Sequence, residues 1–212
     1  MPQLIAMVIV VVGAMIYMFQ TFGGTGDKIE GIAQKTSAIS EINNIKTGLK
    51  LAARAEHIGR TVGNIPADAV RTLEGLSELG YFQEQINNQI DAAATIDTAN
   101  VYNALSFGAD GSMLISLVNN TPGAIPGIFV NFNNGGNSPL FESRAFLEAQ
   151  IANDLGDAAT IDRTAITATA GGINGNNNIA GRTPANNGEA GAANDGMFII
   201  YFNDFGPAEV VQ

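Results

Sequence analysis

The first 26 residues are the most apolar stretch of the chain, and no charged side chain precedes Asp27. From Leu4 to Phe22 nearly every residue is apolar. A run of 18 or more such residues is long enough to cross the hydrocarbon core of a bilayer as a helix. If it were exposed to water, this stretch would cause aggregation. We therefore predict a hydrophobic helical segment over residues 1–26 that lies in a membrane or against other copies of the chain.

Glycines at positions 23, 24 and 26 interrupt this segment. Each costs about 1 kcal/mol relative to alanine inside a helix, so we predict a helix break at Gly23, Gly24 and Gly26. From residue 27 to residue 58, apolar residues recur at three- and four-residue steps, which predicts an amphipathic helix that stops near Gly59. Residues 1–58 are thus predicted to form a long N-terminal helix.

Residues 59–212 alternate between helical and strand patterns, which predicts an α+β globular head with an antiparallel sheet and flanking helices. Helices are expected from Pro66 to Gly80 and from Ser138 to Gly156, and the first of them is open to continuation through residues 81–90. Strands are expected over residues 103–107, 113–118, 128–132, 164–170 and 197–202, with a possible short one at 210–211. The first two flank an Asp-Gly turn and predict a hairpin. Residues 171–195 are rich in Gly, Asn and Ala and predict a long surface loop.

Charge is distributed unevenly along the chain. The net charge is −10, yet residues 1–71 hold seven of the ten Lys and Arg residues and only five of the twenty acids. The remaining part is therefore strongly acidic and would repel phosphate backbones, so no nucleic-acid partner is expected on the head. Cysteine is absent, which excludes disulfides and thiolate metal sites.

The sequence offers no catalytic constellation. His57 is the only histidine, and no G-x-S-x-G motif accompanies it, so we interpret it as a packed or solvated side chain near a helix end. The stretch Gly171–Gly175 lacks the Lys-Ser/Thr of a P-loop and the setting of a Rossmann turn. We predict that the chain is not an enzyme and binds no cofactor.

Two further patterns are weak. The acidic pairs Asp154/Asp157 and Asp195/Asp204 are not set in an Asp-x-Asp-x-Asp-Gly loop, so no metal site is predicted. Asn119 begins an Asn-Asn-Thr triplet that fits the acceptor pattern for N-glycosylation. In an Asn-rich chain, one such match is close to chance.

The N-terminus leads to a family resemblance. No Lys or Arg precedes the apolar run, whereas a secretory signal begins with a basic region. We therefore expect a processed N-terminus from which a basic leader was removed before Met1. A processed apolar helix, a glycine-rich break, an amphipathic continuation and a sheet-bearing head resemble the type IV pilins. The pattern Ile42-Asn-Asn-Ile45, Leu49, Ile65-Pro66-Ala67-Asp68, Leu73, Leu76 and Leu79-Gly80 resembles the type IVb branch most.

This resemblance implies a structural subunit of an extracellular helical filament that polymerises through its N-terminal helix. The chain would be held in the inner membrane before assembly and would have other copies of itself as its partner. The implied filament-core residues are Met1, Gln3, Leu4, Ile5, Val8, Val11, Val12, Gly13 and Ile16.

The chain departs from the family at two points. The family usually has Glu at the fifth mature position, thought to pair with a neighbour's N-terminal amine, and this chain has Ile5. The amine of Met1 then needs another acceptor, such as Gln3 or a neighbour's carbonyl oxygen, or else N-methylation with hydration. The family's major pilins also close their C-terminal region with a disulfide, which this chain lacks. That region is therefore expected to be held by packing and sheet pairing alone.

Two other functions stay open at this point. The missing Glu is compatible with a minor pilin or pseudopilin in a secretion or uptake machine. A membrane-anchored surface protein that binds a ligand or partner would also use an apolar N-terminal segment. An archaeal pilin or flagellin fits less well, because those heads contain few helices.

Overall fold

The structure is a computed structural model, and it describes residues 32–64, 67, 69–93, 101–105, 112–119, 121–169 and 194–212. The chain divides into two units, Met1–Thr36 and Ser37–Gln212. Only residues 32–36 of the first unit belong to the described part. The fold that follows is therefore that of the second unit.

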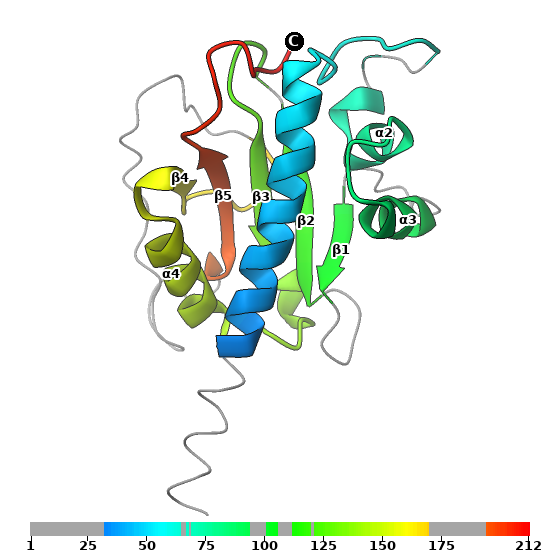
Figure 1. Ribbon diagram of the computed structural model, residues 1–212. Coiled ribbons are helices and arrows are strands. Elements are labelled where there is room, and N and C mark those ends of the chain that lie inside the picture. Colours follow the sequence, from blue (N-terminus) through cyan, green and yellow to red (C-terminus); the bar gives the residue numbers. More distant parts are fainter. Residues whose placement is uncertain are drawn as a thin grey trace, which may run out of the picture. The chain divides into compact units, whose positions relative to one another are not determined.

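A helix over residues 32–54 packs along one face of a sheet from Ser37 onward (Figure 1). Its apolar side chains follow one stripe at three- and four-residue steps, as an amphipathic helix requires. The buried members of that stripe are Ala38, Ile42, Ile45, Leu49, Ala52 and Ala53. The amphipathic helix predicted from the sequence is present within these bounds.

The helix ends at Arg54, four residues before the predicted end. Glu56 adopts a left-handed conformation with φ of 57°. The N–H of Glu56 donates to the carbonyl of Ala53, and the N–H of His57 donates to that of Ala52. These two bonds form a Schellman motif, which terminates the helix, and Ile58 then turns into the core.

The prediction of a long hydrophobic helical stem is wrong as a description of this fold. The structure shows a five-stranded antiparallel sheet with helices, and its N-terminal helix is amphipathic rather than apolar. Within the described ranges, no helix combines the length and the apolar character that a bilayer crossing needs. The prediction of a transmembrane helix is therefore wrong for the part of the chain that the structure describes. Residues 1–31, including the break predicted at Gly23, Gly24 and Gly26, lie outside the described residues.

Two short helices follow the N-terminal helix and lie at one side of the sheet (Figure 1). A 3-10 turn over Ala69–Arg71 leads into α2 (Leu73–Glu78), which the Thr72 side chain caps by accepting from the N–H of Gly75. The predicted start at Pro66 is therefore too early. Gly80, with φ of 72°, ends α2 as predicted. The chain continues into a separate helix, α3 (Glu84–Ala93).

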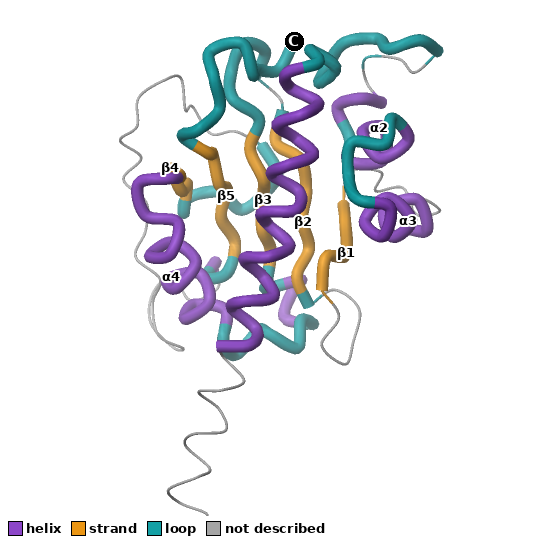
Figure 2. The backbone as a smooth tube through the Cα atoms, viewed as in Figure 1, coloured by secondary structure: helices purple, strands orange, loops and turns teal. Residues whose placement is uncertain are grey.

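The sheet has the strand order β1-β2-β3-β5-β4, and every neighbouring pair is antiparallel (Figure 2). Its strands are β1 (Val101–Leu105), β2 (Met113–Val118), β3 (Gly127–Asn131), β4 (Ala159–Asp162) and β5 (Met197–Phe202). The predicted pairing of the first two strands is confirmed. The bounds predicted for β2 and β5 are confirmed as well, because β5 is a continuous apolar run, β2 is apolar except for Ser116, and both strands are largely buried on both faces.

The sequence pattern predicted the wrong start for one helix and the wrong residues for one strand, both near the β4 edge of the sheet. The helix α4 comprises Arg144–Leu155 and begins after a series of turns, not at Ser138. The edge strand is β4, whereas residues 164–169 form bends instead of the predicted strand. The carboxylate of Asp162 accepts hydrogen bonds from the N–H and the hydroxyl of Thr164. This side-chain turn ends the strand at Asp162.

The two faces of the sheet are covered differently. The N-terminal helix and α4 pack on one face together with the main core, which includes Ile115, Val130 and Phe198. On the other face a smaller cluster contains Val118, Phe129, Ile199 and Tyr201. The main core fixes the N-terminal helix to the sheet, so the solvent-facing side of that helix is a rigid surface.

Candidate interaction surface

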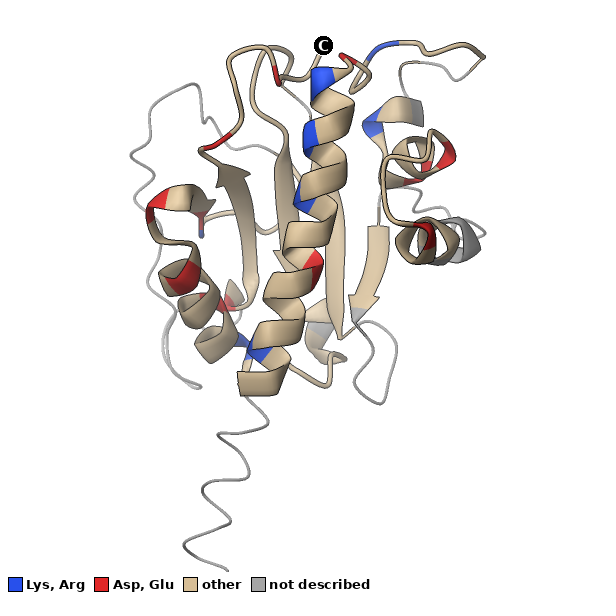
Figure 3. Ribbon diagram, in the orientation of Figure 1, with Lys and Arg blue, Asp and Glu red and all other residues tan. Residues whose placement is uncertain are grey.

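Three basic residues follow one another along one side of the N-terminal helix. Lys46, Lys50 and Arg54 stand four residues apart, which places them in one row. Figure 3 shows several blue segments along this otherwise mostly tan helix, while the red segments of Asp and Glu lie mainly on the flanking helices and loops. The row is thus a local basic strip on an otherwise acidic unit.

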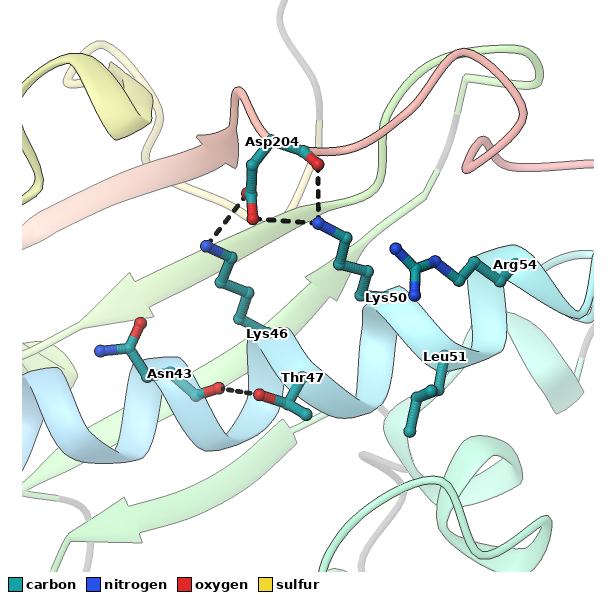
Figure 4. Close-up of a pocket in the computed structure, with 7 residues that line it drawn as sticks. All are labelled: Asn43, Lys46, Thr47, Lys50, Leu51, Arg54 and Asp204. Atoms are coloured by element: carbon teal, nitrogen blue, oxygen red, sulfur yellow. Dashed lines mark hydrogen bonds and ion pairs between the residues drawn. The ribbon is translucent and has the colours of Figure 1, made fainter.

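Asp204, which follows β5, binds two of these bases (Figure 4). Its carboxylate lies 3.0 Å from the Nζ atom of Lys46 and 3.0 Å from that of Lys50. The Nζ atom of Lys50 also donates to the main-chain oxygen of Asp204, at 2.7 Å. Burial raises the pKa of Asp204, but the hydrogen bonds from the two lysines outweigh it and hold the pKa below its usual value.

The third base binds a second acid of the same segment. The Nε atom of Arg54 donates to the Glu209 carboxylate, whose other oxygen accepts from the N–H of Gly206 at 2.7 Å. The Glu209 side chain is only 8% exposed. The bond from Gly206 lowers the pKa of Glu209 most, burial opposes it, and Arg54 lowers it further. We call the set of Lys46, Lys50, Arg54, Asp204 and Glu209 the clasp.

Main-chain hydrogen bonds hold the last two residues of the chain, beyond the clasp. Val211 exchanges bonds with the loop before β3, donating to Ala124 at 2.9 Å and accepting from Gly123 at 2.7 Å. Gln212 donates to the carbonyl of Ile58 at 2.9 Å. The expectation that packing and sheet pairing alone hold this region is wrong, because ion pairs from the N-terminal helix also hold it.

A shallow groove of about 310 Å³ runs beside the clasp. Its lining includes the three bases, Asp204, and the side chains of Thr47 and Leu51 (Figure 4). Leu51 is 50% exposed and points to the other side of the helix from Lys46 and Lys50 (Figure 4).

A second polar cluster lies inside the unit, beneath α4. Glu148 is fully buried and accepts a hydrogen bond from the N–H of Gly196 at 2.8 Å. Arg163 approaches the same carboxylate, with its Nε atom at 3.6 Å. The hydrogen bond from Gly196 ties α4 to the turn before β5.

The residues predicted for filament assembly, from Met1 to Ile16, lie outside the described residues, and so do the three glycines of the predicted break. Asn119 is described, and its Nδ2 atom donates to the carbonyl of Arg71. This is the atom to which a glycan would be attached. Glycosylation at Asn119 stays a prediction, and the amide nitrogen in question already donates a hydrogen bond.

The other residues singled out in the sequence are either far from their predicted partners or take part in contacts within the fold. His57 is partly buried, and its Nδ1 atom is hydrogen-bonded to the hydroxyl of Tyr81. Asp195 is buried, whereas its proposed pair Asp204 belongs to the clasp. Within the part of the chain that the structure describes, no group of three or more His, Cys, Asp or Glu side chains is placed to hold a metal ion. The stretch 171–175 lies outside that part.

Sequence reasoning missed the clasp. The only available signal was the four-residue spacing of Lys46, Lys50 and Arg54 together with the concentration of bases before residue 72. Their partners lie more than 150 residues away, at Asp204 and Glu209.

Comparison of the chain with protein-family models, with curated proteins and with solved structures gives no match. The function proposed below therefore rests on the sequence and on the contacts of the described residues.

Proposed function

We propose that the chain is a structural subunit of an extracellular helical filament of the type IV pilus kind, with its acidic head on the outside. The observation that carries this proposal is the charge-free N-terminal stretch of 26 residues, which leads into an amphipathic helix anchored on a sheet. An apolar stretch of this length must be kept from water. In the proposal, other copies of the chain do so after assembly, and the inner membrane does so before it.

The exchange of lipid for copies of the same stretch replaces one apolar environment by another. The gain in free energy therefore comes from close packing rather than from the hydrophobic effect. Small residues such as Gly13 permit close approach of neighbouring segments. With Ile5 in place of an acid, the filament interior in this proposal holds no buried carboxylate, which would be costly if left unpaired.

The architecture of the head supports an extracellular structural role. The N-terminal helix is fixed to the sheet by a continuous buried stripe, and the clasp fixes the last ten residues to the same helix. A head stabilised in this way needs no disulfide, which is compatible with the absence of cysteine.

The test uses a charge placed inside the apolar stretch. Val12→Asp is expected to abolish filaments in material sheared from the surface of cells that express the chain, as seen by electron microscopy. A carboxylate at this position would be buried without a partner, which costs several kcal/mol. Val12→Ile keeps the apolar character and serves as the matched control, with filaments expected.

Two outcomes would contradict the proposal. Filaments formed by Val12→Asp would show that the apolar stretch is not the assembly segment. A wild-type chain found only in the membrane fraction, and never in sheared filaments, would favour a membrane-anchored surface protein that binds a partner.

A minor subunit is the second candidate, and Ile5 favours it. A member of a filament or secretion machine that lacks the usual acid is suited to a terminal position, where one neighbour is missing. Quantitative mass spectrometry of the sheared filaments separates the two cases. A major subunit makes up most of the protein mass, whereas a minor subunit is scarce beside another pilin.

A further inference from the structure

The segment that follows β5 is attached to the rest of the unit in two different ways. Sheet pairing ends at Phe202, and residues 203–212 form turns and bends. Figure 1 shows this segment in red, running from the end of β5 towards the end of the N-terminal helix. Its residues are exposed or partly exposed except for Phe205, Glu209 and Val211, which are buried. We call residues 203–212 the strap.

The middle of the strap is held by charge. The clasp joins its two acids, Asp204 and Glu209, to the three bases of the N-terminal helix. The carboxylate of Glu209 also accepts a hydrogen bond from the N–H of Gly206, which closes a turn within the strap. Hydrogen bonds to an ionised carboxylate are stronger than those to a neutral group. The attachment of the middle therefore weakens when the two acids take up protons.

Both ends of the strap are held by neutral groups. At its beginning, the side-chain amide of Asn203 donates to the main-chain oxygen of Asp157 at 2.9 Å. At its end, Val211 exchanges main-chain hydrogen bonds with the loop before β3, and the N–H of Gln212 donates to the carbonyl of Ile58. Main-chain groups and side-chain amides do not titrate in acid. These attachments are therefore kept when the pH falls.

One apolar side chain of the middle reaches the core. The ring of Phe205 stacks on that of Phe202, with 6.2 Å between the two centroids. Lys46 lies over the ring of Phe202 and Lys50 over that of Phe205, so two bases of the clasp also cover this aromatic pair. The main core is built mostly from side chains outside the strap, such as Ile45. Opening of the middle would uncover the aromatic pair and leave that core in place, because proteins open locally in cooperative units.

We infer that the strap is an acid-sensitive flap, whose middle opens when Asp204 and Glu209 are protonated while both ends, the helix and the sheet stay in place. The charged groups that act on Asp204 are Lys46 and Lys50, and those that act on Glu209 are Arg54 and Lys50. The pKa values of both acids are lowered in the closed form. The flap is therefore closed above about pH 4, the ordinary pKa of these residue types, and opens as the pH falls below it. The inference concerns the head alone and does not depend on the proposed function.

Hydrogen–deuterium exchange of the full chain in a mild detergent tests this inference. Mass spectrometry follows the middle of the strap, β5 and the N-terminal helix from neutral pH down to about pH 3, below the ordinary pKa of both acids. Protection factors are compared, because they correct for the intrinsic effect of pH on exchange. The middle is expected to lose protection on the order of tenfold, since each partly exposed ion pair shifts an equilibrium by up to about fivefold. The helix, β5 and the amides of Val211 and Gln212 are expected to keep theirs.

A pair of isosteric substitutions reproduces the protonated state at neutral pH. Asp204→Asn with Glu209→Gln is expected to open the middle at pH 7 and to remove most of its response to acid. The matched control, Glu78→Gln with Asp157→Asn, neutralises two exposed acids outside the strap and is expected to keep the wild-type profile. The protection of β5 reports global folding in every variant, so a local opening is distinguished from a loss of the fold.

Any of the following results overturns the inference. Equal loss of protection in the strap and in β5 would show that acid unfolds the whole unit. A middle that stays protected at low pH would show that its neutral contacts are sufficient to hold it. Loss of protection at Val211 together with the middle would show that the end is not a separate attachment. An unchanged acid response in the doubly substituted chain would place the trigger in other acids.

Discussion

At the scale of single residues, Gly48 shows how a residue that weakens a helix by propensity can be required by packing. It lies on the buried side of the N-terminal helix, where the chain between α2 and α3 crosses closely. A Cβ atom at this position would lie 2.8 Å from the carbonyl oxygen of Tyr81 and would meet the ring of Phe82. The absence of a side chain is therefore what allows the two segments to pack.

Gly48→Ala is expected to destabilise the fold. Alanine gains about 1 kcal/mol in helix propensity, but overpacking of a tight contact costs about 1–3 kcal/mol, and here the obstacle is main chain that cannot rotate away. We expect a net loss of free energy of unfolding, measured by urea denaturation of the full chain in a mild detergent.

The control for this substitution is Asn43→Ala, at an exposed position of the same helix. It gains helix propensity without meeting a neighbour, so the stability is expected to be unchanged or slightly higher. A Gly48→Ala protein as stable as the wild type would contradict the packing argument.

Residue-scale signals also explain one error of the sequence analysis. Gly59 was the expected helix stop because glycine adopts the left-handed conformation readily. The residue that adopts it at the helix end is Glu56. No composition rule identifies a glutamate in this role, so the helix end was placed four residues too late.

At the scale of elements, the clasp makes the attachment of the last ten residues depend on pH. The pKa values of Asp204 and Glu209 are lowered in the folded protein. The contribution of such groups is fully present above the pKa values of the unfolded chain, about 4 for these residue types. It is lost as the pH falls below them and the carboxylates take up protons.

Asp204→Asn is expected to lower the free energy of unfolding at pH 7 by about 1 kcal/mol, since two partly exposed ion pairs each contribute about 0.2–1 kcal/mol. The difference between variant and wild type should shrink as the pH falls through the acid range and should vanish once both acids are protonated. Urea denaturation at a series of pH values measures it.

Asp157→Asn provides the matched control, since Asp157 is exposed beyond α4 and lies outside the clasp. Its effect at pH 7 is expected to be close to zero. A deficit of Asp204→Asn that persists unchanged in acid would mean that lost packing, not lost charge, is its cause.

Elements differed in how far the sequence predicted them. The helical stripe through Ile42, Ile45 and Leu49 and the apolar runs of β2 and β5 carry strong periodic signals, and their placement was correct. The edge strand β4 has only four residues and directly follows a helix. The Thr and Ala residues at 164–170 gave a stronger strand pattern, but the turn at Asp162 prevents the strand from continuing there.

At the scale of the whole molecule, the sequence predicted the class of the head but not its interaction surface. Periodicity reports which side chains face the core, so it predicted an antiparallel sheet with helices. The clasp and the groove depend on contacts between Lys50 and Asp204, which are 154 residues apart. Such contacts follow from the topology of the chain and leave no local pattern. The apolar stretch, in contrast, predicted a stem and a transmembrane helix that the described structure does not contain.

The buried stripe of the N-terminal helix has a mechanical consequence. The helix lies along the strands rather than across them (Figure 1). A pull along its axis would therefore load the contacts of Ala38, Ile45 and Ala52 at the same time, in shear, instead of opening them one after another. The clasp adds resistance at the far end of the same helix. Because forced unfolding follows the unfolding rate rather than the equilibrium stability, a head of modest stability can still withstand tension along this axis.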